Sequence, residues 1–597
     1  MFQKIFQFGN TQTADAISVY ANTLYSFEKG YGFLTEENRS ENELLQIPEL
    51  NDGFEIWYWY IGQKLIQIKQ DDTGCYLTHS EKLPLSFKAS VPAAGNYKLT
   101  VTITAGDKPL DDFMVFTGRR HLALRDINLN PHESHTFETI VNVCGFIPRG
   151  KEIPYTDNSI CVTILGNDAR ISALQIEEIA VPTIYIAGDS TLTDQTGGYP
   201  YVPENSYCGW GQFLSFFLNN KASVSNHAHS GLTTESFRSE GHYSIIEKHI
   251  QPNDFFLLQF GHNDQKLSHL TAQGGYRENV LAYIREVREK KAFPVLVTPL
   301  CRNSWKGSDG TYHDLLEDYD KVIRQIGEEE NVPVIALHKK SYDFITEIGL
   351  EDAKRYFFPG DFTHTNDFGG YKMASFIAEG FGELDELKEF LGSERTDWIP
   401  PQKIEPAKPP KGLENVKNPS VASFKVEFTD IDDCGNKDKI VELTSIGVIP
   451  NTDTLFRPTD VITRAEALGM VVKIANFFPT NVYNDMFKDV VGHEWYAGTV
   501  ECAWSNGMVD KALVDENFYP QKEVSYEEMV SFVINGYKSR KTLPETKEAK
   551  TFHCTEWATP YYNAADAIGL LDTSVASSQL LTRQEAGNIL YAFKMAM

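Results

Sequence analysis

Four short apolar runs in the middle of the chain limit its possible folds more than any other feature of the sequence. Longer segments with charges on one face separate these runs. The apolar runs are 184–187, 255–260, 294–297 and 333–337, and the segments between them include 276–291 and 315–330. Continuously apolar strands need cover on both faces, which helical crossovers between parallel strands provide. Residues 182–392 are therefore predicted to form a three-layer α/β/α domain, with functional groups at the carboxyl ends of the strands.

The first 181 residues follow a different pattern, in which short alternating runs are separated by turn residues. Residues 97–103 and 135–141 alternate polar and apolar side chains, as strands with one buried face do. Gly, Asn and Pro cluster at 93–96 and 128–131, where turns are expected. Strands at this spacing predict a β-sandwich over residues 1–181.

The C-terminal residues 423–597 contain an internal repeat of about 60 residues. Thr463, Ser525 and Thr582 are each followed by Glu three residues later, which is the capping box that starts a helix. A second helical segment that ends in Gly precedes each box. This pattern predicts an all-α module of three helical hairpins. A Pro-rich segment at 393–422 is predicted to be a stiff linker to it.

Charge excludes two classes of partner. The chain has 55 Lys and Arg against 82 Asp and Glu, which gives a net charge of −27. Such a surface repels nucleic acids and anionic membranes.

No apolar run approaches the ~20 residues of a membrane helix. The N-terminus lacks the pattern of a signal peptide, which predicts a cytoplasmic protein. A cell-surface location is the alternative if the C-terminal repeats act as an anchor.

The eight cysteines predict neither a disulfide framework nor a metal site. They are scattered along the chain and form no Cys-x-x-Cys pair. Free, mostly buried thiols are therefore expected.

Four polar motifs in the α/β region together supply the groups that acyl transfer requires. Ser190 ends a Gly-Asp-Ser sequence after the first apolar run. Gly231 ends the stretch 224–231, which begins as a short predicted strand, and Asn263 follows the apolar run 255–260. Asp361 and His364 stand three residues apart in one loop, and all four motifs are predicted to lie at strand ends of one sheet. A serine hydroxyl needs a base, usually His, and a carboxylate orients that His. Each motif alone could be an ordinary turn or cap, but the set provides a nucleophile, a base, an orienting group and three oxyanion donors.

These motifs resemble those of the SGNH, or GDSL-type, hydrolases, and in particular their bacterial rhamnogalacturonan acetylesterase branch. The matching stretches are 188–195, 210–212, 226–231, 259–266 and 361–366. The resemblance implies a flavodoxin-like domain with Ser190 as nucleophile, His364 as base and Asp361 as its orienting group. The backbone N–H groups of Ser190 and Gly231 and the side chain of Asn263 would form the oxyanion hole. No metal or organic cofactor is implied.

The flanking regions carry resemblances of their own. Residues 31–33 and 118–120 resemble parts of the carbohydrate-binding-like β-sandwich that precedes such catalytic domains. The C-terminal repeats resemble S-layer homology modules, most closely at 463–466, whereas Tyr526 replaces the signature Arg in the second repeat. That family binds cell-wall polysaccharide. The alternatives are that these helices only pack on the hydrolase or mediate oligomerisation.

The expected function is hydrolysis of O-acetyl esters on pectic, rhamnogalacturonan-type carbohydrate. Another SGNH activity, on acetylxylan or lipid esters, is one alternative. A non-catalytic cell-wall or carbohydrate-binding protein is another, although the complete set of four motifs argues against it. The expected partners are an acetylated oligo- or polysaccharide and a cell-wall polysaccharide bound through residues 423–597, with no nucleic acid and no membrane.

Overall fold

A computed structural model describes most of the chain. It covers residues 2–597 except 12, 56–65, 79–82, 112, 150, 199–200, 307–310, 403–427, 451–453, 476, 478–485, 491–493 and 545–549. The part of the predicted linker at 403–422 lies outside the described residues. The chain divides into two compact units. The first comprises Met1–Asn303, Asp314–Phe358 and His364–Val416, and the second comprises Ser304–His313, Pro359–Thr363 and Lys417–Met597.

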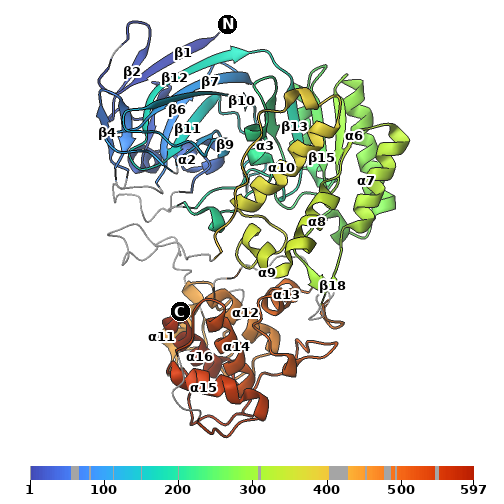
Figure 1. Ribbon diagram of the computed structural model, residues 1–597. Coiled ribbons are helices and arrows are strands. Elements are labelled where there is room, and N and C mark those ends of the chain that lie inside the picture. Colours follow the sequence, from blue (N-terminus) through green and yellow to red (C-terminus); the bar gives the residue numbers. More distant parts are fainter. Residues whose placement is uncertain are drawn as a thin grey trace. The chain divides into compact units, whose positions relative to one another are not determined.

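The first unit begins with two β-sheets, drawn in blue to cyan in Figure 1. One has the strand order β10-β7-β12-β1-β2 with β4 and β5 attached, and the other has the order β3-β6-β11-β8-β9. The bounds are β1 (Gln3–Phe8), β2 (Ile17–Val19), β3 (Tyr31–Leu34), β4 (Ile68–Asp71), β5 (Gly74–Leu77), β6 (Leu85–Ser90), β7 (Gly95–Thr104), β8 (Met114–Thr117), β9 (His121–Leu124), β10 (Ser134–Val143), β11 (Ser159–Leu165) and β12 (Arg170–Ile179).

Side chains from both sheets form one apolar cluster. Strand β7 shows how the alternating sequence produces it, because Leu99, Val101 and Ile103 are fully buried while the residues between them are partly exposed. Strands β7 and β10 cover the two alternating runs predicted above, and they pair antiparallel. Short helices α1 (Glu36–Glu41) and α2 (Glu43–Gln46) follow β3.

A five-stranded parallel sheet follows, in the order β14-β13-β15-β16-β19. Its strands are β13 (Thr183–Gly188), β14 (Ser223–Asn226), β15 (Phe255–Gln259), β16 (Phe293–Val297) and β19 (Val334–Ile335). The helices of this region are α3 (Gly211–Phe217), α4 (Ser236–Ser239), α5 (His242–His249), α6 (Arg277–Glu289), α7 (Glu317–Glu330), α8 (Leu337–Ile348), α9 (Leu350–Ala353) and α10 (Asp367–Glu383).

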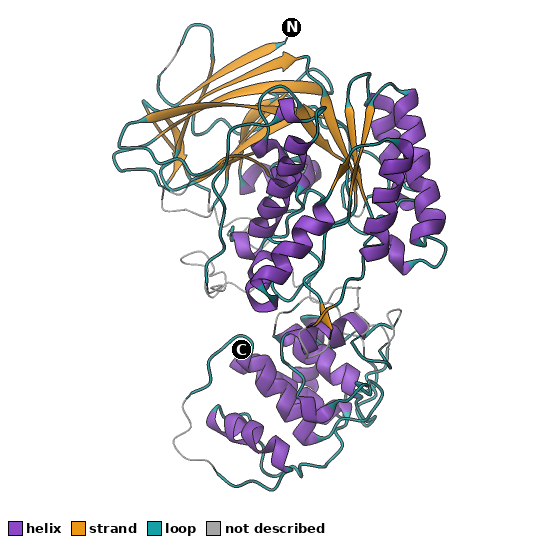
Figure 2. Cartoon of the chain, turned by 45° about the vertical axis from the view of Figure 1, so that its right-hand side comes forward, coloured by secondary structure: helices purple, strands orange, loops and turns teal. Residues whose placement is uncertain are grey.

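Alternate residues of β13 pack against different helical layers. Ile184 and Ile186 belong to the cluster of α3, α8 and α10, whereas Tyr185 and Ala187 belong to that of α5, α6 and α7. Figures 1 and 2 show helices on both faces of this sheet. The predicted three-layer α/β/α arrangement is therefore confirmed. Cover on both faces also explains why β13 is apolar throughout.

Two local expectations differ from the structure. The run 333–337 forms only the two-residue strand β19, because helix α8 begins at Leu337 and its His338 N–H donates to Oγ1 of Thr298 at 2.8 Å. The segment with Asp361 and His364 was expected at a strand end, which is wrong. It lies in the loop before α10, where the Asn366 side chain accepts a hydrogen bond from the Gly369 N–H and starts that helix.

The described residues of the Pro-rich segment pack on helix α10 of the α/β region. The Trp398 ring lies 4.8 Å from that of Phe368 and 5.8 Å from that of Tyr371, both on α10. The Tyr371 hydroxyl also donates to the Thr396 carbonyl at 2.8 Å. Trp398 thus packs, partly buried, against the core of the first unit.

The second unit contains six longer helices in its described part. They are α11 (Lys437–Ser445), α12 (Arg464–Ile474), α13 (Ala497–Ser505), α14 (Tyr526–Lys538), α15 (Thr559–Ala567) and α16 (Arg583–Ala596), and a two-stranded ribbon of β17 (Trp305–Lys306) and β18 (Thr311–Tyr312) also belongs to this unit. All three predicted capping boxes are present at the starts of α12, α14 and α16. Gly447, Gly507 and Gly569 follow α11, α13 and α15 with φ of 75°, 69° and 73°, as C-terminal glycines do.

Arginines of the capping-box segments link one repeat to another. Nη2 of Arg464 donates to Oε1 of Glu528 at 2.6 Å, and Nη1 of Arg583 donates to Oε1 of Glu466 at 2.9 Å. Where a third arginine would stand the chain has Tyr526, and the corresponding Glu585 accepts from Nε2 of Gln579 at 2.9 Å. These arginines therefore hold the module together. In the described residues, no helix has both the length and the apolar character of a membrane span.

Candidate active site

Ser190 lies directly beyond the carboxyl end of β13. The strand ends at Gly188, where a Cβ would come within 2.6 Å of the Gln259 carbonyl oxygen on β15, so only glycine permits this close approach. Oγ of Ser190 lies 2.7 Å from Nε2 of His364, although the two residues are 174 positions apart. Across such a hydrogen bond a serine hydroxyl can pass its proton to an imidazole.

The turn that carries Ser190 is held by the preceding aspartate. Asp189 is fully buried, and its Oδ1 accepts from the Thr191 N–H at 3.0 Å and from the Thr191 hydroxyl at 2.7 Å. Its Oδ2 lies 3.3 Å from Nδ1 of His262. Burial alone would raise the pKa of Asp189, but His262 and the Thr191 hydrogen bonds outweigh it and lower that pKa. Asp189 therefore stays ionised and fixes the turn.

Three hydrogen-bond donors lie on the loops around this turn. Gly231 is exposed with φ of 86°, in the region that favours glycine. Among the described residues, the backbone N–H groups of Ser190 and Gly231 make no hydrogen bond. Nδ2 of Asn263 donates to the Leu232 carbonyl at 3.0 Å, which connects the second and third motifs. An amide carries two N–H bonds, so one remains for a ligand.

The fourth motif lies in the loop before α10. Asp361 is 5% exposed, and its Oδ1 accepts from the Thr363 N–H at 2.7 Å. His364 is half-buried, three residues further along, and its ring meets that of Tyr207 edge-on at 5.9 Å. The structure thus places Ser190 and His364 in direct contact, with Gly231 and Asn263 on neighbouring loops.

Two arginines from the turn between β8 and β9 reach the same loops. Nη1 of Arg120 donates to both carboxylate oxygens of Asp367, at 2.7 and 2.6 Å, and both side chains are fully buried. Its Nε donates to the Gln195 carbonyl at 3.3 Å, and its Nη2 donates to the Tyr207 carbonyl. Burial alone would lower the pKa of Arg120, but the Asp367 carboxylate outweighs it and raises that pKa. The guanidinium therefore connects the loops of the first and fourth motifs.

Arg119 makes equivalent links to the first and second motifs. Its Nε donates to Oδ2 of Asp194 at 2.6 Å, and its Nη2 donates to the Asn226 carbonyl at 2.6 Å. Burial alone would raise the pKa of Asp194, but the charges of His121 and Arg119 outweigh it and lower that pKa to about 2.

This geometry agrees with the family match. Residues 186–370 match the model described as the GDSL-like Lipase/Acylhydrolase family. The chain is 35% identical over 221 residues to a Bacillus subtilis (strain 168) protein named probable rhamnogalacturonan acetylesterase YesY, and the match covers 36% of this chain and 98% of YesY. The chain belongs to the GDSL-like lipase/acylhydrolase family.

Three further matches extend beyond the GDSL-like domain. The chain is 27% identical over 387 residues to a Bacillus subtilis protein named uncharacterized esterase YxiM, covering 62% of this chain and 89% of YxiM. The crystal structure of YxiM covers 64% of this chain and 98% of that chain, at 24% identity and a TM-score of 0.33. Residues 487–530 match the S-layer homology domain model. The resemblances to the GDSL-type hydrolases and to the S-layer homology modules are confirmed, and the chain is an ester hydrolase of the GDSL type.

The arginine contacts were not predicted from the sequence. Residues 118–120 lie outside the GDSL-like match, and Arg120 and Asp367 are 247 positions apart. The available signal was a pair of adjacent arginines after a Gly in a predicted turn. Arginines on a solvent-facing turn need no partner, whereas buried arginines require a carboxylate.

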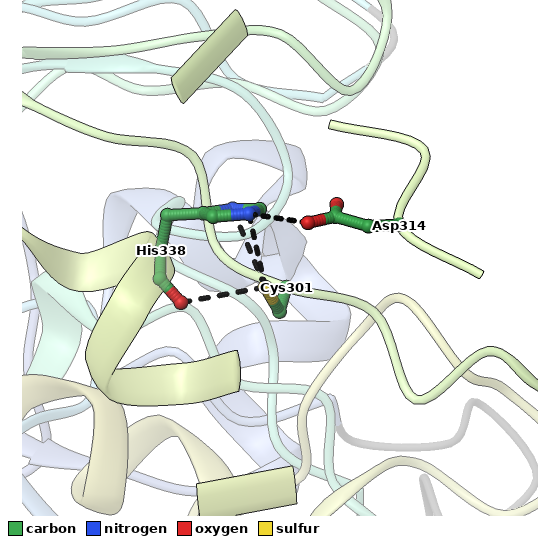
Figure 3. A group of neighbouring side chains, drawn as sticks. All are labelled: Cys301, Asp314 and His338. Carbon is green, nitrogen blue, oxygen red and sulfur yellow. Dashed lines mark hydrogen bonds and ion pairs between the residues drawn. The ribbon is translucent and has the colours of Figure 1, made fainter. Parts of the chain in front are cut away.

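Cys301, Asp314 and His338 form a second polar cluster, shown in Figure 3, with possible metal-binding atoms within 4.8 Å of one another. Nδ1 of His338 lies 2.9 Å from the Pro299 carbonyl, and its Nε2 lies 2.9 Å from Oδ2 of Asp314. The Cys301 sulfur is 3.3 and 3.5 Å from these nitrogens, so it lies beside the ring rather than beyond Nε2. A metal between His338 and Asp314 would need its third ligand beyond Nε2, so this geometry fits a hydrogen-bonded cluster better than a metal site.

Acid is expected to destabilise the GDSL-like domain through His227. This residue is 3% exposed, and burial lowers its pKa to about 3, whereas in the unfolded chain it titrates near 6.5. Between these values the unfolded chain binds the extra proton, so the free energy of unfolding decreases as the pH is lowered, by up to ~1.4 kcal/mol per pH unit. Denaturant unfolding measured from pH 7 to pH 4 should show a weaker dependence of this free energy on pH in His227→Gln than in the unmodified chain. An equal dependence in both proteins would contradict this role.

Proposed function

We propose that this GDSL-family hydrolase removes O-acetyl groups from a pectic, rhamnogalacturonan-type carbohydrate. The 2.7 Å contact between Oγ of Ser190 and Nε2 of His364 carries the proposal, because it pairs a nucleophile with its base. The likeness to YesY, which is named a probable rhamnogalacturonan acetylesterase, supports the choice of substrate.

In the proposed mechanism, His364 takes the Ser190 proton as Oγ bonds to the acetyl carbonyl carbon. The carbonyl oxygen then carries the negative charge. When the C–O bond to the sugar breaks, His364 returns the proton to the departing sugar hydroxyl. Water, deprotonated by His364, hydrolyses the acetyl-enzyme to acetate and free Ser190. Asp361 is proposed to orient His364 and to stabilise its charged form.

The oxyanion is proposed to bind the N–H groups of Ser190 and Gly231 and the Asn263 amide. The two backbone donors make no hydrogen bond within the described chain, which leaves them available. Donors fixed in advance around the developing charge stabilise the transition state more than the ground state.

Asn263→Ala is expected to lower kcat by ~10²–10³ with little change in KM, because the lost donor acts mainly on the transition state. Steady-state kinetics on p-nitrophenyl acetate measure both constants. Asn279→Ala is the matched control, since Nδ2 of Asn279 donates at 3.1 Å to the Thr234 hydroxyl, and it should retain kcat. A change confined to KM would mean that Asn263 binds the substrate instead.

Acetate release by the full chain tests the substrate. Acetylated rhamnogalacturonan, acetylated homogalacturonan and acetylated xylan are compared by kcat/KM, and rhamnogalacturonan should give the highest value. A clear preference for xylan would favour the acetylxylan alternative. Activity on p-nitrophenyl acetate with none on any polysaccharide would contradict a carbohydrate substrate, and no esterase activity at all would support a binding protein.

We also propose a domain organisation of a β-sandwich over 1–181, a catalytic domain over 182–392, a linker over 393–422 and three S-layer homology-like hairpin repeats over 423–597. The three capping boxes and the family match at 487–530 support the last assignment. The repeats are proposed to bind cell-wall polysaccharide and to anchor the enzyme at the cell surface.

The full chain is expected to sediment with purified Gram-positive cell walls, whereas a chain that ends after residue 402 should stay in the supernatant and keep its esterase activity. Ending the chain there retains Trp398, which packs on α10. Centrifugation followed by an activity assay of both fractions measures the distribution. If both chains remain in the supernatant, the anchoring proposal is wrong.

A further inference from the structure

A cleft of about 190 Å³ lies beside the catalytic loops, and both parts of the first unit line it. Glu49, Arg119 and Arg149 come from the region of the two β-sheets, and Gln195 and Ser230 come from the catalytic loops. Nε2 of Gln195 donates to the Ser190 carbonyl at 3.3 Å and to the Ser230 hydroxyl at 3.5 Å. The cleft therefore adjoins the backbone of the proposed nucleophile.

The two arginines of this cleft differ in how they are bound. Arg119 is fully engaged, because it pairs with Asp194 and its guanidinium carbon lies 4.2 Å from the centre of the Phe146 ring. Arg149 is exposed, and its guanidinium makes no hydrogen bond or ion pair with any residue that the structure describes. Arg149 is thus the cation available to a ligand.

None of the other charged groups that the structure describes in the cleft forms an ion pair with the Arg149 guanidinium. Asp194 is paired with Arg119 and also lies 2.9 Å from Nε2 of His121. Oε1 of Glu55 accepts from the Thr196 hydroxyl at 2.5 Å. Burial raises the pKa of Glu49, and it lowers the pKa of His229 and, to about 4, that of His242. The two histidines are therefore neutral near pH 7.

A chain with a net charge of −27 repels an acidic polymer at long range. Salt screens that repulsion at distances beyond about 10 Å. Recognition of such a polymer therefore depends on a cation placed at the site. A guanidinium suits a carboxylate well, because its planar N–H groups can pair with both oxygens.

We propose that this cleft binds a sugar residue that carries a carboxylate, a uronic acid next to the acetylated sugar, and that Arg149 recognises its carboxylate. This inference rests on the proposed carbohydrate esterase function. The β-sheet region would then form part of the substrate site, and Arg149 would determine specificity without taking part in the chemistry.

Inhibition of p-nitrophenyl acetate hydrolysis by unacetylated oligosaccharides tests the cleft. Trigalacturonate is the acidic probe and xylotriose is the neutral one, both with the full chain. Arg149→Ala should raise the inhibition constant of trigalacturonate about tenfold and leave that of xylotriose unchanged. Arg149→Lys should retain part of the effect, because a lysine keeps the charge without the paired N–H groups.

Arg285→Ala is the matched control, since Arg285 is exposed on α6 and outside the cleft. Arg285→Ala should change neither inhibition constant and should keep kcat/KM on p-nitrophenyl acetate. An unchanged trigalacturonate constant in Arg149→Ala, or an equal rise for xylotriose, overturns the inference. If the trigalacturonate effect is found but no polysaccharide is deacetylated, the cleft is supported and the proposed activity fails on its own.

Discussion

Ser190→Ala is expected to lower kcat for acetyl ester hydrolysis by about 10⁵–10⁶, the scale seen when a catalytic serine is lost. The substitution removes the atom that bonds to the acetyl carbon, and no neighbouring group can replace it. The fold should persist, because the contact of Oγ with His364 joins two loops and not two core elements. Acetate release and p-nitrophenyl acetate hydrolysis measure the loss.

Ser239→Ala is the control for this substitution, because Ser239 is an exposed serine at the end of α4 and should be replaceable without effect. Circular dichroism and thermal unfolding should show that both variants fold as the unmodified chain does. A folded Ser190→Ala protein with kcat within tenfold of the original would show that Ser190 is not the nucleophile.

Features set by neighbouring residues were predictable from the sequence. The capping boxes depend on a side chain and a backbone N–H three residues apart, so Thr463 and Glu466 suffice to start α12. Burial on both faces requires an apolar strand, which is why β13 was found within one residue at each end. Strand β19 was overestimated, because an apolar run of five residues serves equally well as a strand or as the start of a buried helix.

The candidate site was predictable where chemistry restricts the residue type. Few side chains can act as nucleophile and base, so Ser190 and His364 could be paired across 174 positions, and the structure places them 2.7 Å apart. Contacts that only position these loops lack such a restriction. An arginine can pair with any of 82 acidic residues, so nothing in the sequence connects Arg120 with Asp367.

Arg120→Ala is expected to lower the free energy of unfolding by about 3–5 kcal/mol, because it leaves the fully buried Asp367 carboxylate without its counter-charge. Denaturant unfolding of the full chain measures this loss. Replacing both partners, as in Arg120→Met with Asp367→Leu, should cost less than Arg120→Ala alone, since no isolated buried charge remains.

The same substitution is expected to reduce catalysis in the protein that remains folded. Arg120 holds the Gln195 carbonyl and Asp367, which stand five residues after Ser190 and three residues after His364. A displacement of about 1 Å between reacting groups can cost ~10² in rate, so kcat should fall at least about tenfold while KM for p-nitrophenyl acetate changes little.

Arg170→Ala is the matched control, because Arg170 is a buried arginine of β12 that pairs with Asp71 at 2.9 Å, outside the catalytic loops. It should lower stability and preserve kcat. If Arg120→Ala behaves in the same way, Arg120 only stabilises the fold, and the turn between β8 and β9 has no part in positioning the catalytic pair.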